Sequence, residues 1–248
     1  MLEFAGLAVL GLVVGAYGTI IGAGGGFILV PVLLILYPDY QPEQLTAVSL
    51  AVVFANATSG SVAYGRQRRV DYLTGLLFAA ASAPGVVAGA LVVHLIPQRL
   101  FSGLFGVMLL LLAVAAIRGT SEKIREPIRG RGVLIRHVSD PEGRTYVYAY
   151  KLWQGIGISA AVGFISSLFG IGGGVIHVPA MIIVLHIPVT YAVATSHFVL
   201  AFMSGGATLI HLLDGSLGRE QIVRAVAPGR SSSRPSTLRR NFSRKSQA

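Results

Sequence analysis

The chain contains no cysteine among its 248 residues. It therefore has no disulfide framework and no thiolate chemistry. Charged side chains are also scarce, at 12% of the sequence, whereas apolar residues of the set AVILMFWYC make up 53%. This balance excludes an ordinary soluble domain and indicates a membrane protein.

Carboxylates are absent from the long apolar runs, and Asp71 and Asp214 stand only at the ends of such runs. A cation site built on Asp or Glu is therefore not expected, which favours an anionic substrate over sodium or a metal ion. An enzyme acting within the membrane would need a carboxylate pair or an HExxH motif, and the apolar runs have neither. His177, His197 and His211 share one run but lack HxxxH spacing, so we expect no metal and no cofactor.

Apolar runs long enough to cross a bilayer fill most of the sequence. A spanning helix needs about 20 apolar residues. We predict an all-α, polytopic transmembrane bundle with four segments in the first half and two in the second, at roughly 4–37, 44–63, 72–95, 100–117, 152–187 and 190–213. The first segment of each half is too long for one straight crossing at about 1.5 Å per residue. A broken helix or a re-entrant hairpin fits better.

A decapeptide occurs twice. GAGGGFILVP at 22–31 returns as GIGGGVIHVP at 170–179, with seven of the ten positions identical. The chain is therefore predicted to contain two internal repeats, each opening with a helix broken at glycines. Non-helical backbone at membrane depth must face protein or a water-filled cavity. A duplicated break of this kind is a pointer to a transport site.

The predicted organisation has four parts: a first repeat at 1–118, a basic cytoplasmic loop at 119–151, a second repeat at 152–229 and a basic disordered tail at 230–248. The second repeat is expected to be incomplete. AVAPG at 225–229 resembles ASAPG at 81–85, but the similarity then stops and six basic residues follow without an acid. We expect either a natural cytoplasmic tail or a truncation or frameshift after Gly229.

All 20 Lys and Arg residues lie outside the apolar cores, chiefly at 64–72, at 118–151 and from Arg219 onward. The positive-inside rule then places the basic loops and the C-terminal tail in the cytoplasm and gives both repeats one orientation. Alternation around the DPEG turn at 140–143 predicts a short hairpin, with Tyr146, Tyr148, Tyr150 and Trp153 near the headgroups. The partners expected are the bilayer and a small anionic solute, with a homo-oligomer left open and no nucleic acid required.

The glycine breaks are the candidate anion site. A helix that restarts after a break exposes its first N–H groups, which carry about half a positive charge, and glycine lets a ligand approach the backbone. A P-loop is excluded, because neither copy has the required lysine. The backbone donors predicted to bind substrate are those of Gly24, Gly25, Gly26, Gly172, Gly173 and Gly174. Tight helix crossing is the alternative role for these glycines.

Polar residues inside the apolar runs are further candidates for substrate contacts: Ser49, Asn56, His177, Ser196 and His197. His177 takes the place of Leu29 of the first copy, three residues after the glycines. A protonated histidine there binds an anion or couples transport to protons. The alternative is that each hydroxyl bonds a carbonyl of its own helix and that the histidine is neutral and bonded to a neighbouring helix.

The glycine-rich breaks followed by Pro31 and Pro179, the AVATS run at 192–196 and the SAPG at 82–85 resemble the TauE/SafE family of membrane permeases. The resemblance covers roughly 4–118 and 152–229. It implies a multi-pass transporter of the bacterial inner membrane that exports sulfite, sulfoacetate or related organosulfur anions. The alternative is a non-transporting or degenerate membrane scaffold with a lipid-binding basic tail.

Overall fold

The computed structural model describes residues 2–38, 40–117, 131–139 and 145–215. The chain is predominantly helical, as predicted. Its helices are α1 (Leu2–Ile21), α2 (Gly26–Leu36), α3 (Pro42–Arg66), α4 (Tyr72–Val92), the short 3-10 helix η1 (Val93–Leu95), α5 (Gln98–Ile117), α6 (Leu152–Phe169), α7 (Gly174–Ile183) and α8 (Val189–Leu213). The two strands are β1 (Val133–Ser139) and β2 (Thr145–Lys151).

Four helices of the described chain are long and apolar enough to cross a membrane: Pro42–Arg66, Tyr72–Leu95, Leu152–Phe169 and Val189–Leu213. Three shorter apolar helices, Gly26–Leu36, Gln98–Val114 and Gly174–Ile183, accompany them. These elements match the apolar runs, and both long first segments are broken into two helices. Local signals fix several boundaries. Gln41 and Gln44 form a capping box at the start of α3, and the side chain of Asp71 caps α4.

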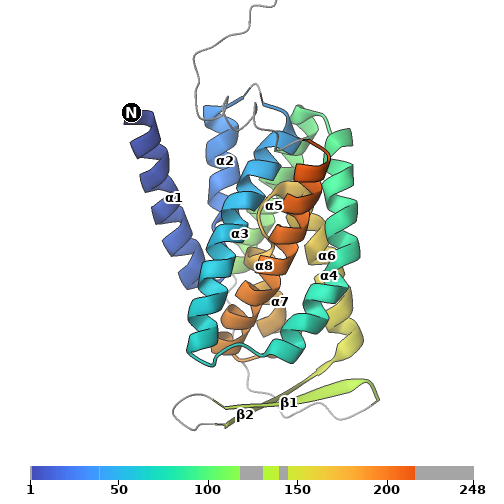
Figure 1. Cartoon of the computed structure of the whole chain (residues 1–248). Helices are drawn as coiled ribbons and strands as arrows, with labels where there is room; N and C mark the ends of the chain where they lie inside the picture. The colour runs from blue at the N-terminus through green and yellow to red at the C-terminus, as the bar shows by residue number, and fades with distance from the viewer. Residues whose placement is uncertain (1, 39, 118–130, 140–144, 216–248) are drawn as a thin grey trace, which may run out of the picture.

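Close helix packing at small residues holds the bundle together. A Cβ atom placed on Gly85 would lie 2.1 Å from the carbonyl oxygen of Ala160, and one on Gly89 would lie 2.4 Å from that of Phe164. The GxxxG spacing in α4 therefore brings the α4 and α6 backbones together. Helices α3 and α8 also pack closely and run in opposite directions (Figure 1).

The predicted hairpin is present, and it docks on one end of the bundle (Figure 1). Strands β1 and β2 pair antiparallel, with Val133 opposite Lys151 and Ser139 opposite Thr145. The expectation that its tyrosines face headgroups is wrong for two of them. Tyr148 and Tyr150 are only 4% and 1% exposed and belong to the main core, whereas Trp153 is 67% exposed.

The expectation of one shared orientation is also wrong. Helices α1 and α2 enter from the end that carries the N-terminus and return to it, whereas α6 and α7 enter from the hairpin end (Figure 1). The reason is that the first broken segment does not cross. Among the described helices, α3, α4 and α5 each pass through the bundle between the two broken segments, and this odd number of passes inverts the second broken segment. Asp214 lies at the end opposite the hairpin, and the tail beyond Gly215 lies outside the described residues.

Candidate functional site

Each glycine break is built from residues in left-handed backbone conformations. After α1, the φ angles of Gly22, Gly24 and Gly25 are 83°, 75° and 86°. After α6, those of Gly170, Gly172 and Gly173 are 70°, 79° and 77°. Residues with a Cβ atom rarely adopt these angles, so these six glycines are needed for the shape of the turns. Gly26 and Gly174 then begin α2 and α7.

The two breaks meet in the interior. A Cβ on Gly26 would lie 2.6 Å from the carbonyl oxygen of Gly170, and one on Gly174 would lie 2.1 Å from that of Gly22. Ala23 and Ile171, in the middle of the two breaks, are both fully buried. The first turns of α2 and α7 therefore start side by side at mid-bundle and run toward opposite ends (Figure 1).

Two of the predicted polar residues donate hydrogen bonds to carbonyl groups of the breaks. Ser49 donates its hydroxyl to the carbonyl oxygen of Gly170 at 2.7 Å, and Asn56 donates its amide to that of Gly24 at 3.2 Å. The amide oxygen of Asn56 also accepts a hydrogen bond from Thr19 at 2.9 Å. Both Ser49 and Asn56 belong to α3, so this one helix anchors both breaks.

The predicted residues of the second half lie in different surroundings. His177 is 1% exposed, lies 3.2 Å by its Nε2 from the hydroxyl of Ser159, and packs edge-on against Phe78. The ring of His197 packs edge-on against Tyr64 and lies close to Gly60. Ser196 is fully buried, and its hydroxyl has no hydrogen-bond partner among the described residues. The structure therefore ties the side chain of His177 to α6 and not to a break.

Two further hydroxyl residues, Thr46 and Ser166, line the second break. A Cβ on Gly170 would lie 2.9 Å from the Cα of Thr46, and one on Gly173 would lie 3.1 Å from the Oγ of Ser166. Both hydroxyl groups are buried and lack a hydrogen-bond partner within the described part of the chain. Their burial beside the break is a signal that only the fold provides, because Thr46 lies 124 residues before Gly170.

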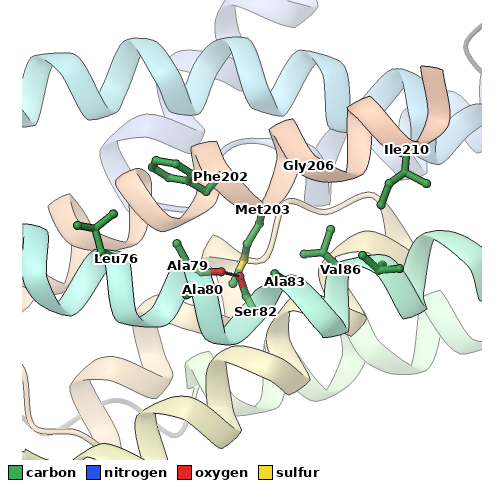
Figure 2. A pocket seen from close by; sticks show the side chains of 11 residues that line it. Leu76, Ala79, Ala80, Ser82, Ala83, Val86, Phe202, Met203, Gly206 and Ile210 are labelled. Carbon is green, nitrogen blue, oxygen red and sulfur yellow. Dashed lines mark hydrogen bonds between the residues drawn. The ribbon is translucent and has the colours of Figure 1, made fainter. Parts of the chain in front are cut away.

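A cavity of about 480 Å³ lies elsewhere, between α4 and α8 (Figure 2). Its lining is almost wholly apolar and includes Leu76, Val86, Phe202 and Met203. The one hydroxyl that it contains, that of Ser82, donates to the carbonyl oxygen of Ala79. The lining offers no free donor for an anion, so this groove is a poor anion site compared with the breaks.

Asp71 forms a charged cluster at the hairpin end that the sequence did not reveal. It is 2% exposed and accepts hydrogen bonds from Arg136 at 2.6 and 2.9 Å, from Tyr148 at 2.6 Å and from the Thr74 hydroxyl at 2.5 Å. Burial alone would raise the pKa of Asp71, but these hydrogen bonds outweigh burial and lower the pKa below its ordinary value. Burial and the Asp71 carboxylate both raise the pKa of Tyr148. The cluster joins β1 and β2 to the start of α4.

Comparison with known proteins places the chain among membrane transporters. A sequence model of the sulfite exporter TauE/SafE family matches residues 7–230. The probable membrane transporter protein YunE of Bacillus subtilis is 36% identical over 221 residues, which cover 86% of this chain and 80% of that protein. A probable membrane transporter protein of Methanocaldococcus jannaschii is 27% identical over 217 residues, covering 86% of this chain and 73% of that protein. No solved structure matches. The chain is therefore a membrane transporter protein of the TauE/SafE sulfite exporter family.

Proposed function

We propose that the chain exports small anions, sulfite or organosulfonates such as sulfoacetate, across the bacterial inner membrane. The observation that carries the proposal is the meeting of two helix N-termini, those of α2 and α7, in the buried middle of the bundle. Discontinuous helices whose N-termini point at an anionic group are a recurrent device of transporters. The family name of the matching sequence model supports sulfite and its relatives as the substrate class.

The energies fit a transported solute. A helix N-terminus stabilises an anion by about 0.3–1 kcal/mol at the surface and by up to about 2 kcal/mol when partly buried. Two termini therefore contribute up to about 4 kcal/mol, which corresponds to a dissociation constant on the order of millimolar. The hydroxyl of Ser166 is placed to add a donor beside Gly173, and Thr46, whose buried hydroxyl has no partner among the described residues, packs against Gly170. Carboxylates are absent between Glu43 and Asp71 and between Glu142 and Asp214, so no acidic side chain in α8 or in most of α3 repels an anion.

The opposite orientations of the helix pairs α1–α2 and α6–α7 suggest how access to the site alternates between the two sides of the membrane. Helices α1 and α2 enter from one end and α6 and α7 from the other (Figure 1). Each helix pair therefore covers the two breaks from its own side of the membrane. Movement of one pair against the other exposes the anion to one side at a time. Arg66, Arg68, Arg69 and Arg136 lie at the hairpin end, which supports that end as the cytoplasmic one.

Efflux from proteoliposomes loaded with sulfite or sulfoacetate tests the proposal. Gly25→Leu and Gly173→Leu each place a side chain on a residue with positive φ and within about 3 Å of a neighbouring helix, near Val14 and Ser166. We expect binding at least about tenfold weaker and a matching loss of flux, because one helix terminus no longer reaches the anion. Gly106→Leu is the matched control, since no atom lies within 4 Å of a Cβ at that position.

Thermal unfolding of the purified variants separates a lost site from a lost fold. Should the leucine variants not fold, Gly25→Ala and Gly173→Ala take their place. A folded variant that exports sulfite at the wild-type rate would contradict the site. A wild-type protein that binds and moves none of these anions would contradict the function and favour a scaffold.

A further inference from the structure

Two histidines and a carboxylate meet at the end of the bundle opposite the hairpin. His94 of η1 lies 3.0 Å by its Nε2 from the Oδ2 of Asp214, which follows α8. His211, one turn earlier in α8, lies 3.7 Å by its Nδ1 from the same oxygen. One potential ligand atom from each of the three residues lies within 4.8 Å of the others. The three side chains therefore converge on one point although 120 residues separate His94 from Asp214.

The hydrogen bonding of His211 is incomplete. Its side chain is fully buried, and neither ring nitrogen has a hydrogen-bond partner among the described residues. A buried polar group without a partner is costly, and most such groups have a water or an ion beside them. The ring faces Asp214 and lies 6.0 Å, between centroids, from the ring of His94. A ligand bound among the three residues would give the His211 ring a partner.

Glu43 completes an outer shell. Its carboxylate lies 3.0 Å from the Nδ1 of His94, on the other side of the ring from Asp214. A metal-binding histidine nearly always donates the N–H of its second ring nitrogen to an acceptor such as a carboxylate. This hydrogen bond fixes the tautomer. The Nε2 of His94 is then the ring nitrogen available to an ion, and it lies beside the carboxylate of Asp214. Side chains of His94 and Asp214 are 29% and 27% exposed, which leaves a path for an ion from solution.

We propose that His94, His211 and Asp214 bind a divalent transition-metal ion of the zinc class at this end of the bundle. Two imidazoles and one carboxylate are donors that suit zinc, nickel or copper, whereas magnesium and calcium prefer oxygen ligands alone. The negative charges of Glu43 and Asp214 balance the ion. Since the ligands come from η1 and from the end of α8, and Glu43 from the start of α3, the ion fastens the two halves of the chain together at this end.

Zinc titration of the purified full chain, produced without a polyhistidine tag, tests the site by calorimetry and by thermal unfolding. We expect one zinc ion per chain and a rise in the unfolding temperature that depends on zinc concentration. His94→Ala, His211→Gln and Asp214→Asn each remove a ligand and abolish this binding. Glu43→Gln removes only the outer-shell carboxylate and weakens binding about 10- to 100-fold.

His137→Ala is the matched control, because His137 lies exposed on β1 at the other end of the bundle and its loss leaves the site intact. A wild-type chain that binds no zinc, or zinc binding that survives in both His94→Ala and Asp214→Asn, would overturn the proposal. Binding that a large excess of magnesium displaces would also contradict it. If His211→Gln does not fold, the two variants at the exposed ligands decide the question.

Discussion

The two ends of the bundle use their charged groups in opposite ways. At the hairpin end, Asp71 is almost wholly buried and is surrounded by Arg136, Tyr148 and Thr74. At the other end, His94, Glu43 and Asp214 are each more than a quarter exposed. Removing one partner from a buried pair leaves an uncompensated charge, whereas exposed pairs contribute little. The hairpin end is therefore a structural joint, whereas the exposed pairs at the opposite end contribute little stability by themselves.

Arg136→Gln is the largest expected disruption of this contrast. It leaves the buried Asp71 carboxylate without its cation, which costs about 3–5 kcal/mol in the free energy of unfolding. Arg131→Gln is the control, because Arg131 is exposed just before β1. Denaturation of both variants in mixed micelles measures the difference. Equal stability of the two variants would show that the hairpin is not held through Asp71.

Acid is expected to release the same joint with a smaller effect, because protonated Asp71 still forms neutral hydrogen bonds. The folded-state pKa of Asp71 lies below its ordinary value of 3.8, so its stabilising contribution is complete above that pH. The contribution is lost as the pH falls through the lower, folded-state value. The fluorescence of Trp153, the only tryptophan and the second residue of α6, reports the change. A transition between pH 5 and pH 8 that depends on Asp71 would contradict this sign.

Tyr148→Phe removes a single hydrogen bond to Asp71. A hydrogen bond to a charged group contributes about 1.5–3 kcal/mol, so the expected loss is smaller than that for Arg136. Tyr146→Phe is the control, because Tyr146 lies on the same strand and packs its ring against Tyr191. The two substitutions remove the same atom, and their unfolding curves compare the buried contact with the neighbouring one.

Glu43→Gln in the presence of a chelator is expected to change least. The pair with His94 is 29% exposed on both sides, and exposed pairs are typically worth about 0.2–1 kcal/mol. Addition of zinc then sharpens the contrast, since the wild type gains stability and the variant gains less. A large loss in the chelated protein would mean that the two ends are built alike.

Much of the architecture could be predicted because charge and hydropathy act locally. The charge-free runs located the helices, the alternation on both sides of 140–143 located the two strands, and the duplicated glycines located the two helix breaks. The inverted entry of α6 could not be read from the basic loops, since it depends on whether the segment around Gly22–Gly26 crosses or returns. The number of arginines in each loop is the same whether that segment crosses the membrane or returns.

The side-chain chemistry was harder to predict, because partners lie far apart in the sequence. Ser49 and Asn56 were expected to contact substrate, and they bond the carbonyl groups of Gly170 and Gly24. Their role in binding an anion stays a prediction. Asp71 stood at a segment end like many surface acids, and only the docking of Arg136 and Tyr148 buries it. Apolar periodicity carries no information about such long-range pairs.

The mutual packing of the two breaks has a consequence for synthesis. The glycines of the first break leave the ribosome 148 residues before the matching glycines of the second break. At about 5–20 residues per second, the first break waits roughly 7–30 s without the neighbour against which Gly26 packs. Exposed non-helical backbone is costly in lipid. The nascent segment is therefore expected to stay with the insertion machinery, or at the bilayer surface, until the later half of the chain arrives.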